Sequence, residues 1–160
     1  AENYLPLWHL FHTMPHVTTY NRTIAAERVQ DVLTVTGIAR DYFGMRKVAL
    51  VGLGGFGVDA VMAAPLADEI QAVAADLTEF DPENDADWLE KCYVPLIQGL
   101  GGLRVPLALL APRRLRVAGL TGRTAHWARG AYEARGRSDA LTISSKLPKP
   151  DALARWLAEK

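Results

Sequence analysis

The stretch V-A-L-V-G-L-G-G-F-G-V-D-A-V-M-A-A, from Val48 to Ala64, decides the fold of this chain. Its first four residues are apolar, with valine at both ends, which predicts a strand covered on both faces. The glycines Gly52, Gly54 and Gly57 follow with the spacing G-x-G-x-x-G, and small apolar residues come after them. The pattern predicts a strand, a glycine turn and a helix that lies close on the sheet.

Two classes of protein build a strand, turn and helix of this kind. In dinucleotide-binding domains, backbone amides at the helix N-terminus hold a pyrophosphate. That interpretation assigns Gly52, Gly54 and Gly57 to the pyrophosphate of NAD(P). It assigns Asp76, about 20 residues further on at the end of the next apolar run, to the ribose. In α/β hydrolases the same turn is the nucleophile elbow, G-x-S-x-G.

Length and composition describe one globular domain. The chain has 160 residues, 49% hydrophobic and 22% charged, which suits a single core. Lys+Arg and Asp+Glu number 18 each, so net charge gives no reason to expect nucleic acid or an anionic membrane as a partner. No apolar run approaches the roughly 20 residues that a membrane span needs. Cys92 is the single cysteine, which excludes an internal disulfide and leaves the compartment open.

Residues 1–18 form a lead-in rich in aromatic side chains and histidine, ahead of a domain over residues 19–160. His9, His12 and His16 are spaced to lie on one face of a helix, as a metal site would require. Pro15 interrupts that helical register, and no carboxylate stands among the histidines. We therefore expect no metal there, and interpret the segment as half-buried aromatic packing.

The rest of the chain alternates between strands and helices. A long helix is expected over residues 20–43, capped by Asn21 and ended by Gly44. Its predicted apolar stripe consists of Ala25, Val29, Val32, Ala39 and Phe43. Strands are expected over 47–53, 70–76, 115–120 and 140–144, and helices over 56–67, 88–98, 103–111 and 124–135, with a last helix capped by Asp151. Such alternation predicts an α/β fold: a parallel sheet with helices on both faces.

Three stretches of the chain resemble bacterial acetylxylan-esterase-like α/β hydrolases. They are T-Y-N-R-T-I-A-A-E-R-V-Q-D-V-L-T from Thr19 with the following strand, A-V-A-A-D-L from Ala72, and L-A-P-R-R-L from Leu110. The similarity runs from about Thr19 to the C-terminus. It implies the C-terminal half of an α/β-hydrolase fold, a serine-esterase ancestry and a carbohydrate ester as the ancestral substrate.

The chain departs from that family at the positions of all three triad residues. The nucleophile position of the elbow is Gly54, beside Gly55, and glycine has no side chain that can attack a carbonyl. No carboxylate stands at residues 120–122, where the family carries its acid. No histidine stands at residues 144–147, where the family carries its base, and the last histidine in the chain is His126. His126, at the start of a predicted helix, is a weak catalytic candidate that we interpret as a half-buried structural residue.

Three functions follow as hypotheses. The first is a degenerate α/β-hydrolase domain without cofactor, a structural or binding half of a larger carbohydrate-esterase-like protein. The second is part of an active esterase whose nucleophile lies elsewhere, and the third is the NAD(P)-binding domain described above. Under the family resemblance, the strand at Val48 would be an open apolar edge, which isolated proteins avoid. We therefore expect a second polypeptide, a missing N-terminal half or a further copy of the chain to complete the sheet.

Overall fold

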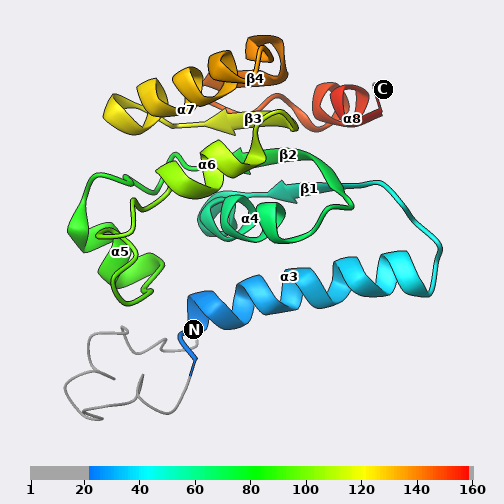
Figure 1. The fold of residues 1–160 in the computed structure, drawn as a ribbon, viewed down its shortest axis with the longest axis horizontal. Coiled ribbons are helices and arrows are strands. Elements are labelled where there is room, and N and C mark those ends of the chain that lie inside the picture. Colours follow the sequence, from blue (N-terminus) through cyan, green and yellow to red (C-terminus); the bar gives the residue numbers. More distant parts are fainter. Residues whose placement is uncertain (1–21, 159–160) are drawn as a thin grey trace.

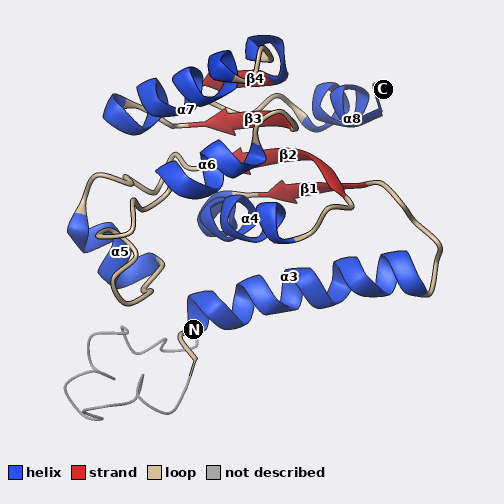
Figure 2. Ribbon diagram, in the orientation of Figure 1, coloured by secondary structure: helices blue, strands red, loops and turns tan. Residues whose placement is uncertain are grey.

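The core of the structure is a four-stranded parallel sheet. The computed structural model describes residues 22–158. The strands lie in the order β1-β2-β3-β4, so each is a neighbour of the next in sequence (Figures 1 and 2). Their bounds are Val48–Gly52 for β1, Ile70–Asp76 for β2, Arg114–Ala118 for β3 and Leu141–Ser144 for β4. All three pairings are parallel, which confirms the predicted α/β class.

The helices form a row on one face of this sheet, with one more on the other face. The row consists of α3 (Ile24–Asp41), α4 (Gly57–Ala63), α6 (Arg104–Leu110) and α7 (Gly122–Ala134). In that row α3 packs on α4, α4 touches α6, and α6 packs on α7. The short α5 (Asp85–Lys91) lies to one side, and α8 (Pro150–Ala158) ends the described chain (Figure 1).

The two faces of β3 show how the layers are divided. Leu115 and Val117 are fully buried in the core beneath the row of helices. Arg114 and Arg116 alternate with them, and both guanidinium groups lie over the ring of Trp156 in α8, at 4.6 and 5.0 Å from its centroid. Alternate residues of a strand point to opposite faces, so α8 covers the face away from the row.

Helix α3 differs from its prediction at both ends and along its stripe. It begins after Thr23, whose Oγ1 accepts a hydrogen bond from Ala26 N at 3.2 Å, so Thr23 is its cap. The expected cap Asn21 lies outside the described residues. Of the 18 residues of α3, only Ala25 and Thr36 are buried. The predicted core residue Phe43 lies beyond the end of α3 and is 64% exposed.

The other helices differ from their expected bounds by smaller amounts. The helix expected over 88–98 spans Asp85–Lys91, since Asn84 caps it earlier by accepting from Ala86 N. The helix expected over 56–67 ends at Ala63 and continues as a 3₁₀ turn, Ala64–Leu66. In α7, Tyr132 is buried but Trp127 is half exposed, with its indole N–H donated to Arg104 O. Asp151 lies within the first turn of α8 and is not its cap.

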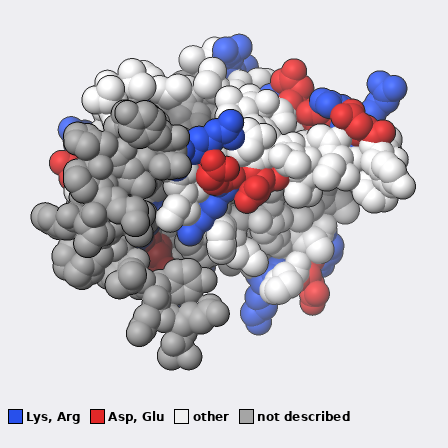
Figure 3. Space-filling model, turned by 90° about the horizontal axis from the view of Figure 1, so that it is seen from below, with Lys and Arg blue, Asp and Glu red and all other residues white. Residues whose placement is uncertain are grey.

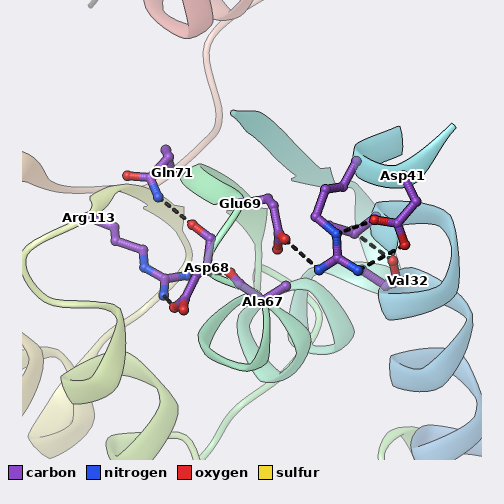
Figure 4. A network of polar contacts seen from close by, with 9 residues as sticks. Val32, Asp41, Ala67, Asp68, Glu69, Gln71 and Arg113 are labelled. Carbon is purple, nitrogen blue, oxygen red and sulfur yellow. Dashed lines mark hydrogen bonds and ion pairs between the residues drawn. The ribbon is translucent and has the colours of Figure 1, made fainter. Parts of the chain in front are cut away.

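Arg113, within the segment that resembles the hydrolase family, has a structural role. Its Nη1 donates to three carbonyl oxygens, those of Ala64 and Ala67 at 2.8 Å and that of Ile70 at 3.0 Å. Its Nη2 pairs with Asp68 at 3.1 Å (Figure 4). One guanidinium thus holds the end of a helix, the following turn and the start of β2 together.

The same region joins α3 to the sheet through a second arginine. Arg40, in the last turn of α3, pairs with Glu69 just before β2 at 2.7 Å and with its neighbour Asp41 at 2.6 Å. These contacts hold the pKa of both carboxyls below their usual values, chiefly through the hydrogen bonds from Arg40. The far end of α3 is therefore held by charge, because apolar packing there is sparse.

Candidate functional site

The four parallel strands all end on the same side of the sheet, and ligands of open α/β sheets usually bind at this C-terminal end of the strands. The glycine turn follows β1 there, and the loops after β2, β3 and β4 lie beside it in order. Two bonds tie these loops together, Leu77 N to Ala118 O and Gly119 N to Ser144 O, both at 2.9 Å. The C-terminal end of the strands is the candidate site.

Gly54 occupies the tip of the turn. Its φ is +54°, in the left-handed region that residues with side chains rarely adopt. A Cβ built at Gly54 would meet no atom within 4 Å, so a side chain there would point into open space. This is the geometry of a nucleophile elbow, whose central residue is strained and exposed. Gly54 brings no reactive atom to it.

Gly52 and Gly57 have a different reason for being glycine, which is close packing. A Cβ on Gly57 would stand 1.9 Å from the carbonyl oxygen of Asp76. One on Gly52 would stand 2.5 Å from Phe56 O and 2.7 Å from the Cβ of Ala60. The first turn of α4 therefore lies directly on the ends of β1 and β2. Both hydrolase elbows and dinucleotide sites require this approach, so the spacing alone does not choose between them.

Asp76, the predicted ribose ligand, lies at the end of β2, next to Gly57. Its Oδ1 accepts from the backbone N–H of Thr78 at 3.0 Å and from the Thr78 hydroxyl at 2.7 Å. This oxygen is therefore engaged in a local turn. It closes the loop that leaves β2.

A carboxylate does stand beside the turn after β3, but it comes from another part of the chain. Glu83 accepts from Thr124 N at 2.9 Å and from Arg123 Nε at 3.1 Å, at the start of α7. These bonds, led by that from Thr124, hold the pKa of Glu83 below its usual value. Residue pattern did not single out Glu83, because its role depends on the loop between β2 and α5 folding back onto the start of α7.

The loop between β2 and α5 is rich in acidic residues and folds as a set of turns. Asp81 Oδ1 accepts from Glu83 N at 2.9 Å, and Asp87 Oδ2 accepts from Asp81 N at 2.6 Å. Across residues 22–158, no group of three His, Cys, Asp or Glu side chains could hold a metal ion. The candidate ligands His9, His12 and His16 lie outside the described residues.

His126, the weak catalytic candidate, is exposed on α7 and not half-buried as expected. It belongs to the helix between β3 and β4, whereas Gly54 follows β1 at the edge of the sheet. His126 is the single histidine in the part of the chain that the structure describes. The structure therefore brings no nucleophile, acid and base together at the glycine turn within residues 22–158.

A buried carboxyl with a partly exposed arginine beside it lies behind the turn, and the sequence did not indicate this pair. Asp59, in the first turn of α4, is buried, and neither of its carboxylate oxygens has a hydrogen-bond partner. Arg28 Nη1 of α3 lies 3.6 Å from Asp59 Oδ2, and its guanidinium lies over the Phe56 ring. Burial raises the pKa of Asp59 despite the positive charge of Arg28. Burial, and then the charge of Asp59, raise the pKa of the nearby Cys92 thiol to about 12.

No family model, curated protein or solved structure matches this chain. The fold and the site nevertheless define a class. It is an α/β protein with a parallel sheet, a glycine strand-turn-helix on the edge strand and no catalytic side chain at the tip of that turn. Within residues 22–158, none of the helices has the length and apolar character needed to cross a membrane.

Proposed function

We propose that the chain is a degenerate α/β-hydrolase domain, esterase-like in ancestry, that serves as a structural or ligand-binding half of a larger carbohydrate-esterase-like protein. The observation that carries this proposal is Gly54. It stands at the tip of a strand-turn-helix with a φ of +54° and open space beside it, where a hydrolase holds its nucleophile.

The order of elements supports the same ancestry. A long helix, the strand of the glycine turn and three further strand-helix units follow the C-terminal half of an α/β hydrolase. The close approach of Gly57 to the end of β2 fits the tight elbow of that fold. The segment around Arg113 that resembles the family fits a structural motif. The Arg113 guanidinium donates hydrogen bonds to three carbonyl oxygens and takes no part in the candidate site.

The absence of a triad predicts that the chain has little or no hydrolase activity. Without nucleophile, base and acid, only binding and backbone stabilisation of charge remain, which are orders of magnitude weaker than the full triad. Glu83 does not replace the missing acid, because its carboxylate is bound by Thr124 and Arg123.

A fluorophosphonate probe tests this proposal, since it labels serine nucleophiles that a base has activated. We expect no labelling of the purified chain under conditions that label a known serine esterase to completion. Labelling of any serine or threonine of this chain, located by peptide mass spectrometry, would overturn the proposal.

The second candidate is a dinucleotide-binding domain, favoured by the position of Asp76 at the end of β2, where its backbone lies against Gly57 at the start of α4. Saturating NAD(H) or NADP(H) would then raise the melting temperature, because a ligand that binds only the folded state stabilises it. An unchanged melting temperature with all four nucleotides would rule this candidate out.

The third candidate, an esterase whose nucleophile lies elsewhere, is favoured by the open edge of the sheet. It predicts that the complete assembly hydrolyses aryl acetates or acetylated sugars although this chain alone does not. Lack of turnover by the complete assembly would exclude it.

A further inference from the structure

Helix α3 is held to the rest of the described chain by sparse apolar contact. It packs on α4, and on no other helix or strand of residues 22–158 to a comparable extent (Figure 1). Only Ala25 and Thr36 of its 18 residues are buried, and the Thr36 hydroxyl donates to Val32 O of the same helix at 2.8 Å. In α4, six of seven residues are buried. Since apolar burial is the main force that holds an element in place, α3 is held far less firmly than α4.

Two ion pairs fix α3 at separate points. Arg28 Nη1, in its first half, lies 3.6 Å from Asp59 Oδ2 of α4. Arg40 Nη1, in its last turn, lies 2.7 Å from Glu69 Oε1 before β2 (Figure 4). Seen from the side of α3, the visible Lys, Arg, Asp and Glu side chains stand in small separate groups (Figure 3). Charge therefore holds α3 at points and not along its whole length, and each partly exposed pair contributes little.

The segment between α3 and β1 can act as a hinge. Residues 42–47 belong to no helix or strand, and all six are exposed. Gly44 within this segment has a φ of +67° and open space beside it. Exposed loop residues of this kind absorb the changes in φ and ψ when a neighbouring element swings. A movement of α3 therefore need not disturb the sheet.

The contact between α3 and α4 contains a carboxyl that water would stabilise. Asp59 is buried, and neither of its oxygens has a hydrogen-bond partner. Among the described residues, Arg28 from α3 is the charged group that faces Asp59, and the Cys92 thiol after α5 is the titratable group nearby. When α3 leaves α4, Asp59 regains water on that side and can ionise freely. Hydration of this carboxylate then offsets part of the contacts that are lost.

We infer that α3 is a hinged helix, which swings away from α4 as one unit about residues 42–47 while the rest of residues 22–158 stays folded. This inference rests on the contacts of α3 and not on the proposed ancestry of the chain. Release is favoured as the pH rises from about 5 toward 8, because the docked helix keeps Asp59 protonated to a higher pH than the released helix does. Glu69 acts in the opposite sense below about pH 4, since the hydrogen bond from Arg40 lowers its pKa and is lost once Glu69 is protonated.

Hydrogen exchange of the unmodified chain tests this inference. A single helix without packing is only marginally stable in water, so the amides of α3 should exchange when it is released. We expect them to exchange together, at least about tenfold faster than those of α4 and β2, with little dependence on urea below the unfolding transition. Exchange of α3 only through global unfolding, with the same urea dependence as β2, would overturn the inference.

Thiol labelling reports the separation of α3 from α4 directly. Cys92→Ala removes the natural thiol, and Ala25→Cys then places one at a position of α3 that is 4% exposed. Ala140→Cys, at a position before β4 that is 7% exposed, is the matched control. With N-ethylmaleimide, and relative to the unfolded chain at the same pH, the Ala25→Cys variant should label at least about tenfold faster than the control. Equal rates in the two variants would overturn the inference.

Further variants test what holds the helix. Arg40→Met removes one of the two ion pairs and should speed labelling of the Ala25→Cys variant about twofold to fivefold. Arg137→Met, at an exposed arginine paired with Asp139, is the control and should not. Between about pH 5 and pH 8 the normalised rate should rise about threefold or more, and Asp59→Asn should abolish the rise. A rate that does not change with pH, or a rise that persists in Asp59→Asn, would overturn the role given to Asp59.

Discussion

Arg28 and Asp59 join α3 to α4 directly behind the glycine turn, with Arg28 Nη1 3.6 Å from Asp59 Oδ2. The distance is that of an ion pair and is longer than a hydrogen bond, so the buried carboxylate keeps both oxygens unbonded. A carboxyl in this state favours its protonated form. The stability of the contact between α3 and α4 should therefore depend on pH and change when either side chain is replaced.

The raised pKa of Asp59 predicts how stability depends on pH. A carboxyl whose pKa is higher in the folded state binds more protons in the folded protein than in the unfolded chain. The free energy of unfolding therefore falls as the pH rises above about 4, the pKa of this carboxyl in the unfolded chain. The fall ends once pH passes the raised pKa. Asp59→Asn should remove this fall, measured by urea unfolding between pH 4 and 8. The matched control Asp68→Asn, at a fully exposed carboxyl, should keep it. An unchanged slope in Asp59→Asn would contradict the interpretation.

The pair itself can be measured by a double-mutant cycle. Arg28→Met leaves the Asp59 carboxylate buried without a counter-charge, which we expect to cost about 1–2 kcal/mol at pH 7, reduced by the partial exposure of Arg28. In the Asp59→Asn background the same change should cost less than about 0.5 kcal/mol. Equal costs in both backgrounds would show that Arg28 acts through Phe56 or packing alone.

The three glycines of the turn should differ in their tolerance of alanine. Gly57→Ala drives a Cβ into the backbone of Asp76 and should cost about 3 kcal/mol or more. Gly54→Ala meets open space but keeps a positive φ, so about 1 kcal/mol is expected. Gly55→Ala, with neither restriction, should lie within about 0.5 kcal/mol of the wild type. Urea unfolding ranks the three, and a Gly57→Ala variant as stable as Gly55→Ala would refute the close packing of α4 on β2.

Arg113 should contribute more to the free energy of unfolding than an exposed arginine does. Arg113→Met leaves three carbonyl oxygens without their shared donor, which predicts a loss of about 2–3 kcal/mol in the free energy of unfolding. Arg113→Lys should recover only part of it, because an ammonium cannot reproduce the planar fork. Arg104→Met, at an exposed arginine with a single 3.3 Å bond to Gly101 O, is the control and should change little. Equal effects of Arg113→Met and Arg104→Met would disprove the structural role.

The sequence predicted most of the elements, since the signals for them are local. Strand β2 has its predicted bounds, Ile70–Asp76, because apolar residues fill it and loop residues flank it. The parallel pairing of the strands followed from the alternation of strands and helices. The prediction that the apolar stripe of α3 is buried was wrong. An apolar stripe predicts a covered face, but it does not reveal whether the covering element is present.

The contacts that define the candidate site were harder to predict. Glu83 and Asp59 take their roles from elements distant in sequence, α7 and α3, and no spacing connects them. The lack of a nucleophile at Gly54 could be predicted, because it depends on one residue in a recognisable turn. The open space beside Gly54 could not, because it depends on how the loops after the strands are placed.

Native mass spectrometry of the protein purified gently from its source tests the central claim most directly. If the chain is a non-catalytic half of a larger hydrolase-like sheet, it should appear bound to a second polypeptide or as part of a longer one, with no added cofactor mass. A lone chain or self-dimer carrying the added mass of a dinucleotide would contradict the account, and the glycine turn would then be a phosphate-binding loop.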